Sequence, residues 1–235
     1  MDLLYPRECC VCGCVLESDE RFLCQDCLCD LPRTFFWTWR DNPSEQILWA
    51  RSYFREVVSL FYYSEDNDYC HLIHEIKYHG NPPLARYLGY MLGRLMVEGG
   101  SDGDIDILVP VPLHWRKQWK RGYNQSYHIC CGLKKGLEEA RAERGRPGEI
   151  RIETKLLRRI RYAESQTTKS MEEKWDNVKD AYALNPHRAK KLGPGHHILI
   201  VDDVLTSGAT AEACYKVLGG HFRDLSYGAL CSVGN

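Results

Sequence analysis

The strongest constraint on the fold lies near the carboxyl end of the chain, where an apolar run meets two adjacent carboxylates. Residues 197–201 read His-Ile-Leu-Ile-Val, and Asp202 and Asp203 follow directly. A turn of small and hydroxyl residues comes next, and a helical pattern then covers residues 211–218. This order is typical of a buried parallel strand, a tight turn and a helix whose N-terminus faces the turn. We therefore expect an α/β fold with a binding turn at one strand end.

The turn has the chemistry of a phosphate cradle. Backbone N–H groups at a helix N-terminus bind phosphate, and a glycine lets the backbone approach the ligand closely. The two carboxylates would accept hydrogen bonds from the two hydroxyls of a ribose beside the phosphate. A strand end with solvent-facing acids is the alternative, but it leaves the hydroxyl-rich turn unexplained. The residues expected to hold the phosphate are Leu205, Thr206, Ser207, Gly208, Ala209 and Thr210.

This segment resembles the phosphoribosyl-diphosphate (PRPP) loop of the type I phosphoribosyltransferases. The match consists of the hydrophobic strand, Asp202-Asp203, one spacer residue and a turn rich in Thr, Ser and Gly. A Walker A loop is excluded because the segment has no Gly-Lys-Ser/Thr. The resemblance implies a type I phosphoribosyltransferase-like parallel sheet, with ribose on the two carboxylates and the 5′-phosphate on the turn. Mg²⁺ would bridge diphosphate and ribose oxygens.

A cysteine cluster near the N-terminus predicts a metal site. Seven of the twelve cysteines lie between residues 9 and 29. A cluster beside a few scattered cysteines favours a metal site over a disulfide framework, and a reduced cysteine-rich tail is the alternative. Two Cys-x-x-Cys pairs suit tetrahedral Zn²⁺, which would supply the folding energy of so short a module. The predicted ligands are Cys9, Cys12, Cys24 and Cys27. Spare thiols that could replace one of them are Cys10, Cys14 and Cys29.

Patterns along the rest of the chain predict three parts. Residues 1–33 form the zinc module, residues 34–50 an aromatic and turn-rich linker, and residues 51–235 the phosphoribosyltransferase-like domain. Strands alternating with helices predict a mainly parallel sheet. Further strands are expected over residues 51–63, 105–113, 152–157 and 225–233, and further helices over residues 69–78, 84–97 and 133–142.

Composition excludes several classes of protein. The net charge of −1 gives no general electrostatic attraction to nucleic acid. No run of 18 apolar residues exists, and the N-terminal residues lack a secretory pattern. We therefore expect a cytoplasmic protein without membrane insertion.

A basic, aromatic segment follows the expected strand over residues 105–113. Four cations and three aromatic residues share residues 115–123. Because this segment follows a neighbouring strand of the same sheet, its cations can neutralise the diphosphate leaving group. Interleaved rings and cations also suit stacked single-stranded nucleic acid, and a solvated basic loop is the third interpretation. The residues assigned to the diphosphate interpretation are Pro112, Leu113, His114, Arg116, Lys117 and Arg121.

Two further features have weaker signals. Residues 160–178 are polar and without apolar periodicity, which predicts a mobile loop that can exclude water from a reactive ribosyl centre. An ordinary surface connection is the alternative. Lys77, just before His79 and Gly80, could bind an anion or could simply end a solvated helix.

Taken in order, these segments resemble the ComF family, the competence-protein-F group of phosphoribosyltransferase-like proteins. The resemblance covers the two cysteine pairs, residues 76–80, residues 109–125 and residues 201–210. This chain has Ala163, Lys174 and Ser207 where the family often has Thr, Arg and Thr. Positions that match the family's loop are Arg159, Arg161, Gln166 and Asn177.

The resemblance implies a role in DNA uptake during natural competence, beside a helicase-like partner protein. Two classes of function stay open. One is a phosphoribosyltransferase that transfers the ribosyl group from PRPP to a small nucleophile. The other is a non-catalytic module that binds single-stranded DNA and retains the PRPP loop for nucleotide or strand contact. The sequence contains no element that identifies an acceptor base or amine.

Overall fold

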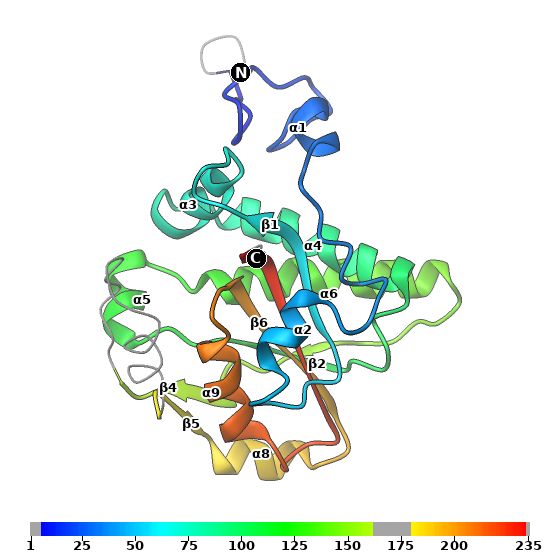
Figure 1. Cartoon of the computed structure of the whole chain (residues 1–235), viewed down its shortest axis with the longest axis vertical. Coiled ribbons are helices and arrows are strands. Elements are labelled where there is room, and N and C mark those ends of the chain that lie inside the picture. Colours follow the sequence, from blue (N-terminus) through cyan, green and yellow to red (C-terminus); the bar gives the residue numbers. More distant parts are fainter. Residues whose placement is uncertain (1–5, 162–179, 234–235) are drawn as a thin grey trace.

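A five-stranded parallel sheet forms the centre of the protein (Figure 1). The computed structural model describes residues 6–161 and 180–233. Every pair of neighbouring strands in this sheet is parallel, as the sequence predicts for an α/β fold. From edge to edge the strands are β1 (Val57–Tyr63), β7 (Asp224–Val233), β6 (His197–Leu205), β2 (Ile107–Pro110) and β3 (Arg151–Ile152).

The strand register places the candidate site at the carboxyl edge of the sheet. Strand β6 pairs with β2 up to Pro110↔Val201 and with β7 up to Leu205↔Ser232. Parallel strands end at one common edge, so the turn after β6 and the basic segment after β2 emerge side by side. In open parallel sheets, ligands bind outside these carboxyl ends.

Helices cover both faces of the sheet (Figure 1). The long helices α4 (Pro82–Gly99) and α6 (Gln125–Glu143) pack together on one face, near α3 (Cys70–Tyr78). A second core on the other face includes side chains of α2 (Pro43–Leu48) and α9 (Ala209–Leu218). The remaining elements are α1 (Gln25–Cys29), α5 (Trp115–Arg121), α8 (Pro186–Leu192) and an antiparallel pair, β4 (Leu157–Arg159) and β5 (Tyr182–Leu184).

The cysteine module is continuous with the core of the sheet. Leu16, Leu23 and Leu31 belong to the same buried cluster as residues of α3, α4 and α6. The Tyr69 hydroxyl, just before α3, donates a hydrogen bond of 2.9 Å to the backbone carbonyl of Cys27. The boundaries of the three parts at residues 33 and 50 stay a prediction.

Three departures from the sequence-based expectations bear on the site. Residues 115–121 form helix α5, because His114 accepts a hydrogen bond from the N–H of Arg116 at its start. Helix α2 lies inside the expected linker, where Asn42 caps it and proline occupies its first turn. The strand expected over residues 152–157 is two short strands, β3 and β4, separated by a turn.

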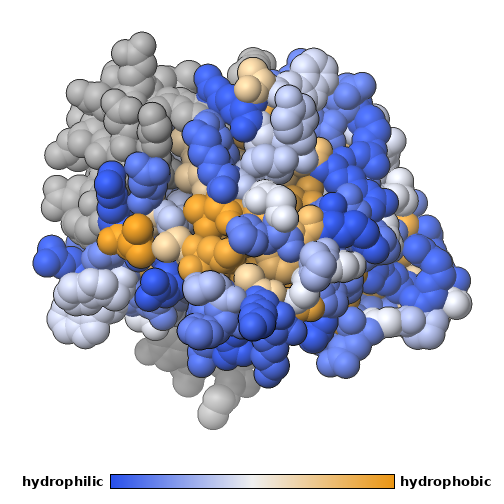
Figure 2. Space-filling view, turned by 90° about the horizontal axis from the view of Figure 1, so that it is seen from below, coloured by the Kyte–Doolittle hydropathy of each residue, from blue (hydrophilic) through white to orange (hydrophobic). Residues whose placement is uncertain are grey.

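The described helices include none with the length and apolarity needed to cross a bilayer. Figure 2 shows the face seen from below, where hydrophilic residues surround a central apolar patch.

Candidate functional site

The two adjacent carboxylates near the end of β6 are almost completely buried. The exposed fraction is 8% for Asp202 and 6% for Asp203. The Tyr227 hydroxyl donates to Asp202 Oδ2 at 3.0 Å, and the backbone N–H of Asp203 donates to Asp202 Oδ1 at 2.9 Å. The Ser126 hydroxyl donates to the same Oδ1 at 3.4 Å. These contacts fix Asp202 from three different directions.

Asp203 is the end of a polar chain that reaches the surface. Gln125 Nε2 donates to Asp203 Oδ2 at 2.8 Å, and Arg121 Nη1 donates to Gln125 Oε1 at 2.6 Å. Lys77 Nζ lies 3.3 Å from Asp203 Oδ1. The ion pair joins the end of α3 to β6, so Lys77 belongs to this site and is not a solvated helix terminus.

The pKa values of this group follow from burial and from its neighbours. Burial and then repulsion by Asp203 raise the pKa of Asp202 to about 6. Burial would lower the pKa of Lys77, but the attraction of Asp203, Cys231 and Asp202 raises it above the ordinary value. The ammonium of Lys77 therefore remains charged and compensates part of the negative charge of the carboxylate pair.

The turn after β6 is shaped by one glycine. Gly208 has a φ of +79°, a left-handed conformation that favours glycine, and α9 begins at the next residue. A Cβ atom at Gly208 would lie 2.6 Å from Leu48 Cδ2, so α2 packs directly against the turn. A pocket of about 180 Å³ opens here, lined by residues 204–210 and Tyr227. The predicted phosphate-binding residues thus line one pocket that reaches the partner of Asp202.

Four cations from three separate elements, α3, α5 and β4, gather beside the carboxylates. Burial, followed by repulsion from Arg159, Arg121 and Lys77, lowers the pKa of Lys117, while Asp203 raises it. Arg159 of β4 lies over the Tyr182 ring, 5.4 Å from its centroid, and its Nε is buried without a hydrogen-bond partner in the described parts of the chain. The structure therefore places four of the predicted residues, from distant parts of the sequence, in one basic cluster.

Helix α5 exposes the aromatic residues of the basic segment. Trp115 and Trp119 are 67% and 86% exposed, which is unusual for side chains of this size. The Arg116 guanidinium lies 5.2 Å from the ring centroid of Trp115. Pro112 and Leu113 are half-buried and connect β2 to this helix.

Not every predicted residue can be placed. Arg161 is exposed at the end of the first described range. Gln166 and Asn177 lie outside the described residues, together with most of the expected loop over residues 160–178.

Four cysteine thiols of the N-terminal module form a site that can hold a metal ion. The Sγ atoms of Cys9, Cys12, Cys24 and Cys27 all lie within 4.8 Å of one another. Cys12 Sγ and Cys24 Sγ are 3.8 Å apart, and a tetrahedron with Zn–S bonds of about 2.3 Å has sulfur atoms about 3.8 Å apart. The donor set and its spacing therefore fit a tetrahedral ion.

The spare thiols differ in their position around this site. Burial, with Glu75 and Cys9 nearby, raises the pKa of Cys10 to about 11, which keeps it protonated. The neighbouring thiols of Cys12 and Cys24 raise the pKa of Cys14 to about 12. Cys29 is exposed, and Gln25 Nε2 contacts its sulfur at 3.5 Å. Of the three, Cys14 is the thiol placed to exchange with a ligand.

Three residues of the site were not among the predicted site residues. Gln125, Ser126 and Tyr227 touch the carboxylates, but they come from α6 and β7 and belong to no binding motif. Gln125 carries the one available signal, because it closes the segment over residues 109–125 on which the predicted family resemblance rests.

Fold and site together define an α/β protein with a buried carboxylate pair, a glycine turn and a four-cysteine cluster. Comparison with known proteins refines this class. No protein-family model matches the chain. It is 28% identical over 113 residues to competence protein F of Haemophilus influenzae, a match covering 48% of this chain and 44% of that protein.

Proteins named DNA utilization protein YhgH match over a longer stretch. Identity to the protein of Salmonella typhimurium is 29% over 164 residues, which cover 68% of this chain and 65% of that protein. Identity to the protein of Escherichia coli K12 is 27% over 150 residues, which cover 63% of this chain and 59% of that protein. The matches thus span less than two thirds of these relatives. They confirm the predicted resemblance of the chain to the ComF family.

Proposed function

We propose that the chain binds PRPP together with Mg²⁺ at the carboxyl edge of its sheet, as a phosphoribosyltransferase-like protein. One observation carries the proposal. The buried pair Asp202–Asp203 lies between a hydroxyl-rich glycine turn and a cluster of four cations. A sugar that bears a phosphate on one side and a diphosphate on the other has the complementary arrangement of groups.

Each part of the site has a role in this proposal. Asp202 and Asp203 accept hydrogen bonds from the ribose hydroxyls, and the turn over residues 205–210 holds the 5′-phosphate. Lys77, Lys117, Arg121 and Arg159 face the diphosphate and stabilise its charge as it leaves. Lys77 exchanges its partner Asp203 for the ligand. The two carboxylates have the oxygen donors that Mg²⁺ prefers, and the ion would neutralise diphosphate oxygens when bound.

A role in DNA uptake follows from the relatives. Their names refer to competence and to DNA utilization, and we carry this role over to the chain. In this proposal the protein acts in the cytoplasm, with PRPP as its small-molecule ligand and a helicase-like competence protein as its partner. The four-cysteine site holds one structural Zn²⁺.

Calorimetry with PRPP and Mg²⁺ tests the binding. We expect saturable binding that the double variant Asp202→Ala/Asp203→Ala abolishes. The matched control is Asp66→Ala/Asp68→Ala, which removes the same charge from two exposed residues outside the site. Binding that survives the first double variant would refute the assignment. Diphosphate release in a screen of acceptor bases and amines then separates a transferase from a protein that only binds PRPP.

The exposed rings of α5 support a second candidate, the binding of single-stranded DNA. Trp115, Trp119 and the neighbouring cations present stacking faces and phosphate contacts on one short helix. About four phosphate contacts predict a log–log salt slope of roughly −3, and each lost stacking face should cost roughly 1–3 kcal/mol. We expect weak binding without sequence preference.

Fluorescence anisotropy of a labelled oligonucleotide tests this candidate. Arg116→Ala/Arg121→Ala should weaken binding, but Arg121 also contacts Gln125 within the carboxylate site. Trp119→Ala/Lys120→Ala is the sharper variant, because it should weaken DNA binding and leave PRPP binding intact. Affinity that does not depend on salt, or that both variants retain, would exclude α5 as the strand contact.

A further inference from the structure

A second pocket lies at the amino edge of the sheet, away from the carboxylate pair. It has a volume of about 120 Å³ and is formed where residues 36–40 wrap around the start of β1. Three aromatic residues, two carboxylates, two hydroxyls and one guanidinium contribute to its lining. These residues are Phe36, Trp37, Thr38, Trp39, Arg40, Glu45, Glu56 and Ser101.

Two buried oxygen atoms that line this pocket have no hydrogen-bond partner. In the described parts of the chain, four buried side-chain polar atoms lack a partner, and two of them are Glu56 Oε2 and Ser101 Oγ. The side chain of Glu56 is 7% exposed. A buried acceptor without a donor is unfavourable, so native proteins leave few of them. Two acceptors on one pocket indicate that a hydrogen-bond donor belongs there.

The other acceptors of this pocket are already occupied. Arg40 Nη2 donates to Glu56 Oε1 at 2.8 Å, from a side chain that is 59% exposed. The Glu45 carboxylate accepts the backbone N–H groups of Asp41 and Val57 at 2.6 and 3.3 Å. Of the carboxylate oxygens in this pocket, the second oxygen of Glu56 is therefore the one available to a ligand, beside the Ser101 hydroxyl. A carboxylate oxygen among aromatic rings suits a cation.

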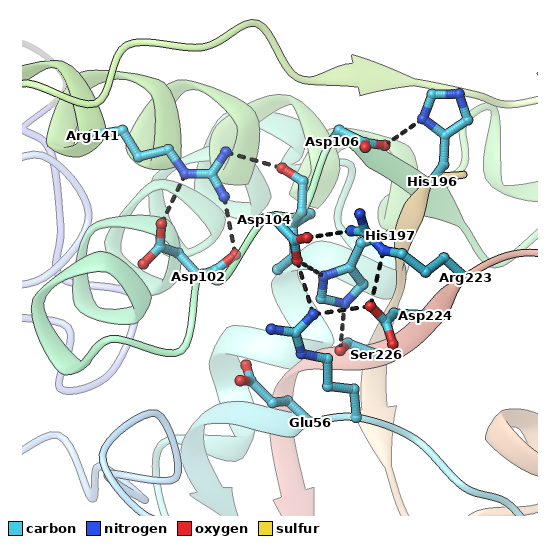
Figure 3. A network of polar contacts seen from close by, with 12 residues as sticks. Glu56, Asp102, Asp104, Asp106, Arg141, His196, His197, Arg223, Asp224 and Ser226 are labelled. Carbon is cyan, nitrogen blue, oxygen red and sulfur yellow. Dashed lines mark hydrogen bonds and ion pairs between the residues drawn. The ribbon is translucent and has the colours of Figure 1, made fainter. Parts of the chain in front are cut away.

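The polar network beside this pocket is closed to ligands. Arg55 Nη1 lies 2.9 Å from both Asp104 Oδ1 and Asp224 Oδ2, so it occupies the position that a metal ion between them would take. His197 bridges Asp104 and the Ser226 hydroxyl, but Ser226 is 1% exposed. Figure 3 shows Glu56 next to this network and not joined to it by any dashed line.

We propose that this pocket binds a small organic primary ammonium ion. Glu56 and Ser101 accept its N–H groups, and the rings of the linker surround its alkyl part. The volume fits a group of a few heavy atoms. An ammonium has three donors on a compact head, which matches two separated oxygen acceptors better than a planar guanidinium does.

The ionisation of Glu56 should make the affinity for an ammonium ion depend on pH. Burial, with Glu45 and Asp102 nearby, raises the pKa of Glu56 to about 7, although Arg40 and Arg55 oppose this shift. An ammonium ion binds the ionised carboxylate. Its affinity should therefore increase as the pH rises from 6 to 8, the range in which the carboxyl group loses its proton.

Ethylammonium chloride is the probe, and the indole N–H signals of Trp37 and Trp39 in an NMR titration are the readout. A ligand of three heavy atoms should bind with a dissociation constant of about 1 mM. Potassium chloride at equal ionic strength and ethanol should not reproduce the shifts. Glu56→Gln and Ser101→Ala should each weaken binding at least about fivefold, the effect of one charge-assisted or neutral hydrogen bond.

Glu65→Gln is the matched control, because it removes one exposed carboxylate beyond the other end of β1. Thermal unfolding checks that every variant is folded, and Ser101→Ala remains a test if Glu56→Gln is not. Indole shifts that are absent at 50 mM probe, about fiftyfold the expected constant, or that salt alone reproduces, would overturn the proposal. Equal affinity of the parent and the folded variants would overturn it as well.

Discussion

At the scale of single residues, the buried Asp202 carboxylate lowers the stability of the folded protein in the form that we expect to bind PRPP. Its carboxyl group has a pKa of about 6 in the folded protein against an ordinary value of 3.8. The folded state therefore binds more protons than the unfolded state between these values. The favourable contribution of the protonated group is complete below about pH 4 and is lost as the pH rises through 6. At neutral pH the folded protein keeps a buried charge that it would be more stable without.

Asp202→Asn should accordingly stabilise the protein at pH 8 and abolish PRPP binding. A shift of about two pKa units corresponds to about 3 kcal/mol, and a lost hydrogen bond offsets about 1 kcal/mol of this. We expect the free energy of unfolding in urea to rise by about 1–3 kcal/mol at pH 8 and to change little at pH 4. A variant that is less stable than the parent at pH 8 would show that Asp202 is held ionised at no cost.

Residue patterns located the carboxylate pair and the turn of this candidate site, but not the side chains that contact the pair. The pair Asp202–Asp203 and the turn after it form a contiguous motif, so the sequence alone located them. Gln125 and Tyr227 reach the same carboxylates from elements 78 and 25 residues away. Such supports depend on tertiary packing, and a single glutamine or tyrosine carries no local pattern that identifies them.

At the scale of elements, glycines set the distance between α4 and α6. A Cβ atom at Gly132 would lie 1.9 Å from the carbonyl oxygen of Arg86, and one at Gly136 would lie 2.3 Å from that of Tyr90. Both contacts are with backbone, which cannot move aside as a flexible side chain can. Alanine, although a better helix former, therefore cannot enter these positions without separating the helices.

Gly132→Ala should destabilise the protein by about 3 kcal/mol or more, at the upper end of overpacking effects. Gly148→Ala is the control, because no atom lies within 4 Å of the added Cβ there. We expect that change to alter stability by less than about 0.5 kcal/mol. Urea denaturation of both variants measures the difference, and equal stabilities would mean that the two helices can move apart freely.

Helix α3 connects the cysteine cluster to the carboxylate pair. At its start the Tyr69 hydroxyl binds the carbonyl of Cys27, and near its end Lys77 pairs with Asp203. The sequence pattern predicted this helix correctly, since its apolar side chains recur at helical spacing. It could not predict α5, because a seven-residue helix with no buried side chain has no apolar stripe.

Removing the metal should loosen α3. Elemental analysis of the native protein should find about one zinc per chain, and Cys24→Ser should lower this content. In the zinc-depleted variant, amide hydrogen exchange over residues 70–78 should accelerate at least about tenfold, which corresponds to about 1.4 kcal/mol of lost local stability. Cys29→Ser, which alters an exposed spare thiol, should keep both zinc and slow exchange. Unchanged hydrogen exchange in the zinc-depleted variant would show that the stability of α3 does not depend on the metal.

At the scale of the whole molecule, the net charge of −1 hides a strong local asymmetry. The parallel sheet brings cations from α3, α5 and β4 to one edge, although they lie far apart in the sequence. Composition alone argued against nucleic-acid binding, and this argument holds for the average field of the protein. It does not hold for one edge, because electrostatic attraction decays within a Debye length of about 8 Å at physiological salt.

PRPP and single-stranded DNA should therefore compete for this edge. Lys117 and Arg121 lie on α5 with the exposed rings, yet they also belong to the cluster around Asp203. A diphosphate held by these cations lowers the positive potential that a DNA strand needs. Saturating PRPP with Mg²⁺ should weaken the affinity for a labelled oligonucleotide severalfold, and Asp202→Ala/Asp203→Ala should remove this effect while the strand still binds. If both ligands bind without mutual influence, the rings of α5 and the carboxylate site act on separate surfaces.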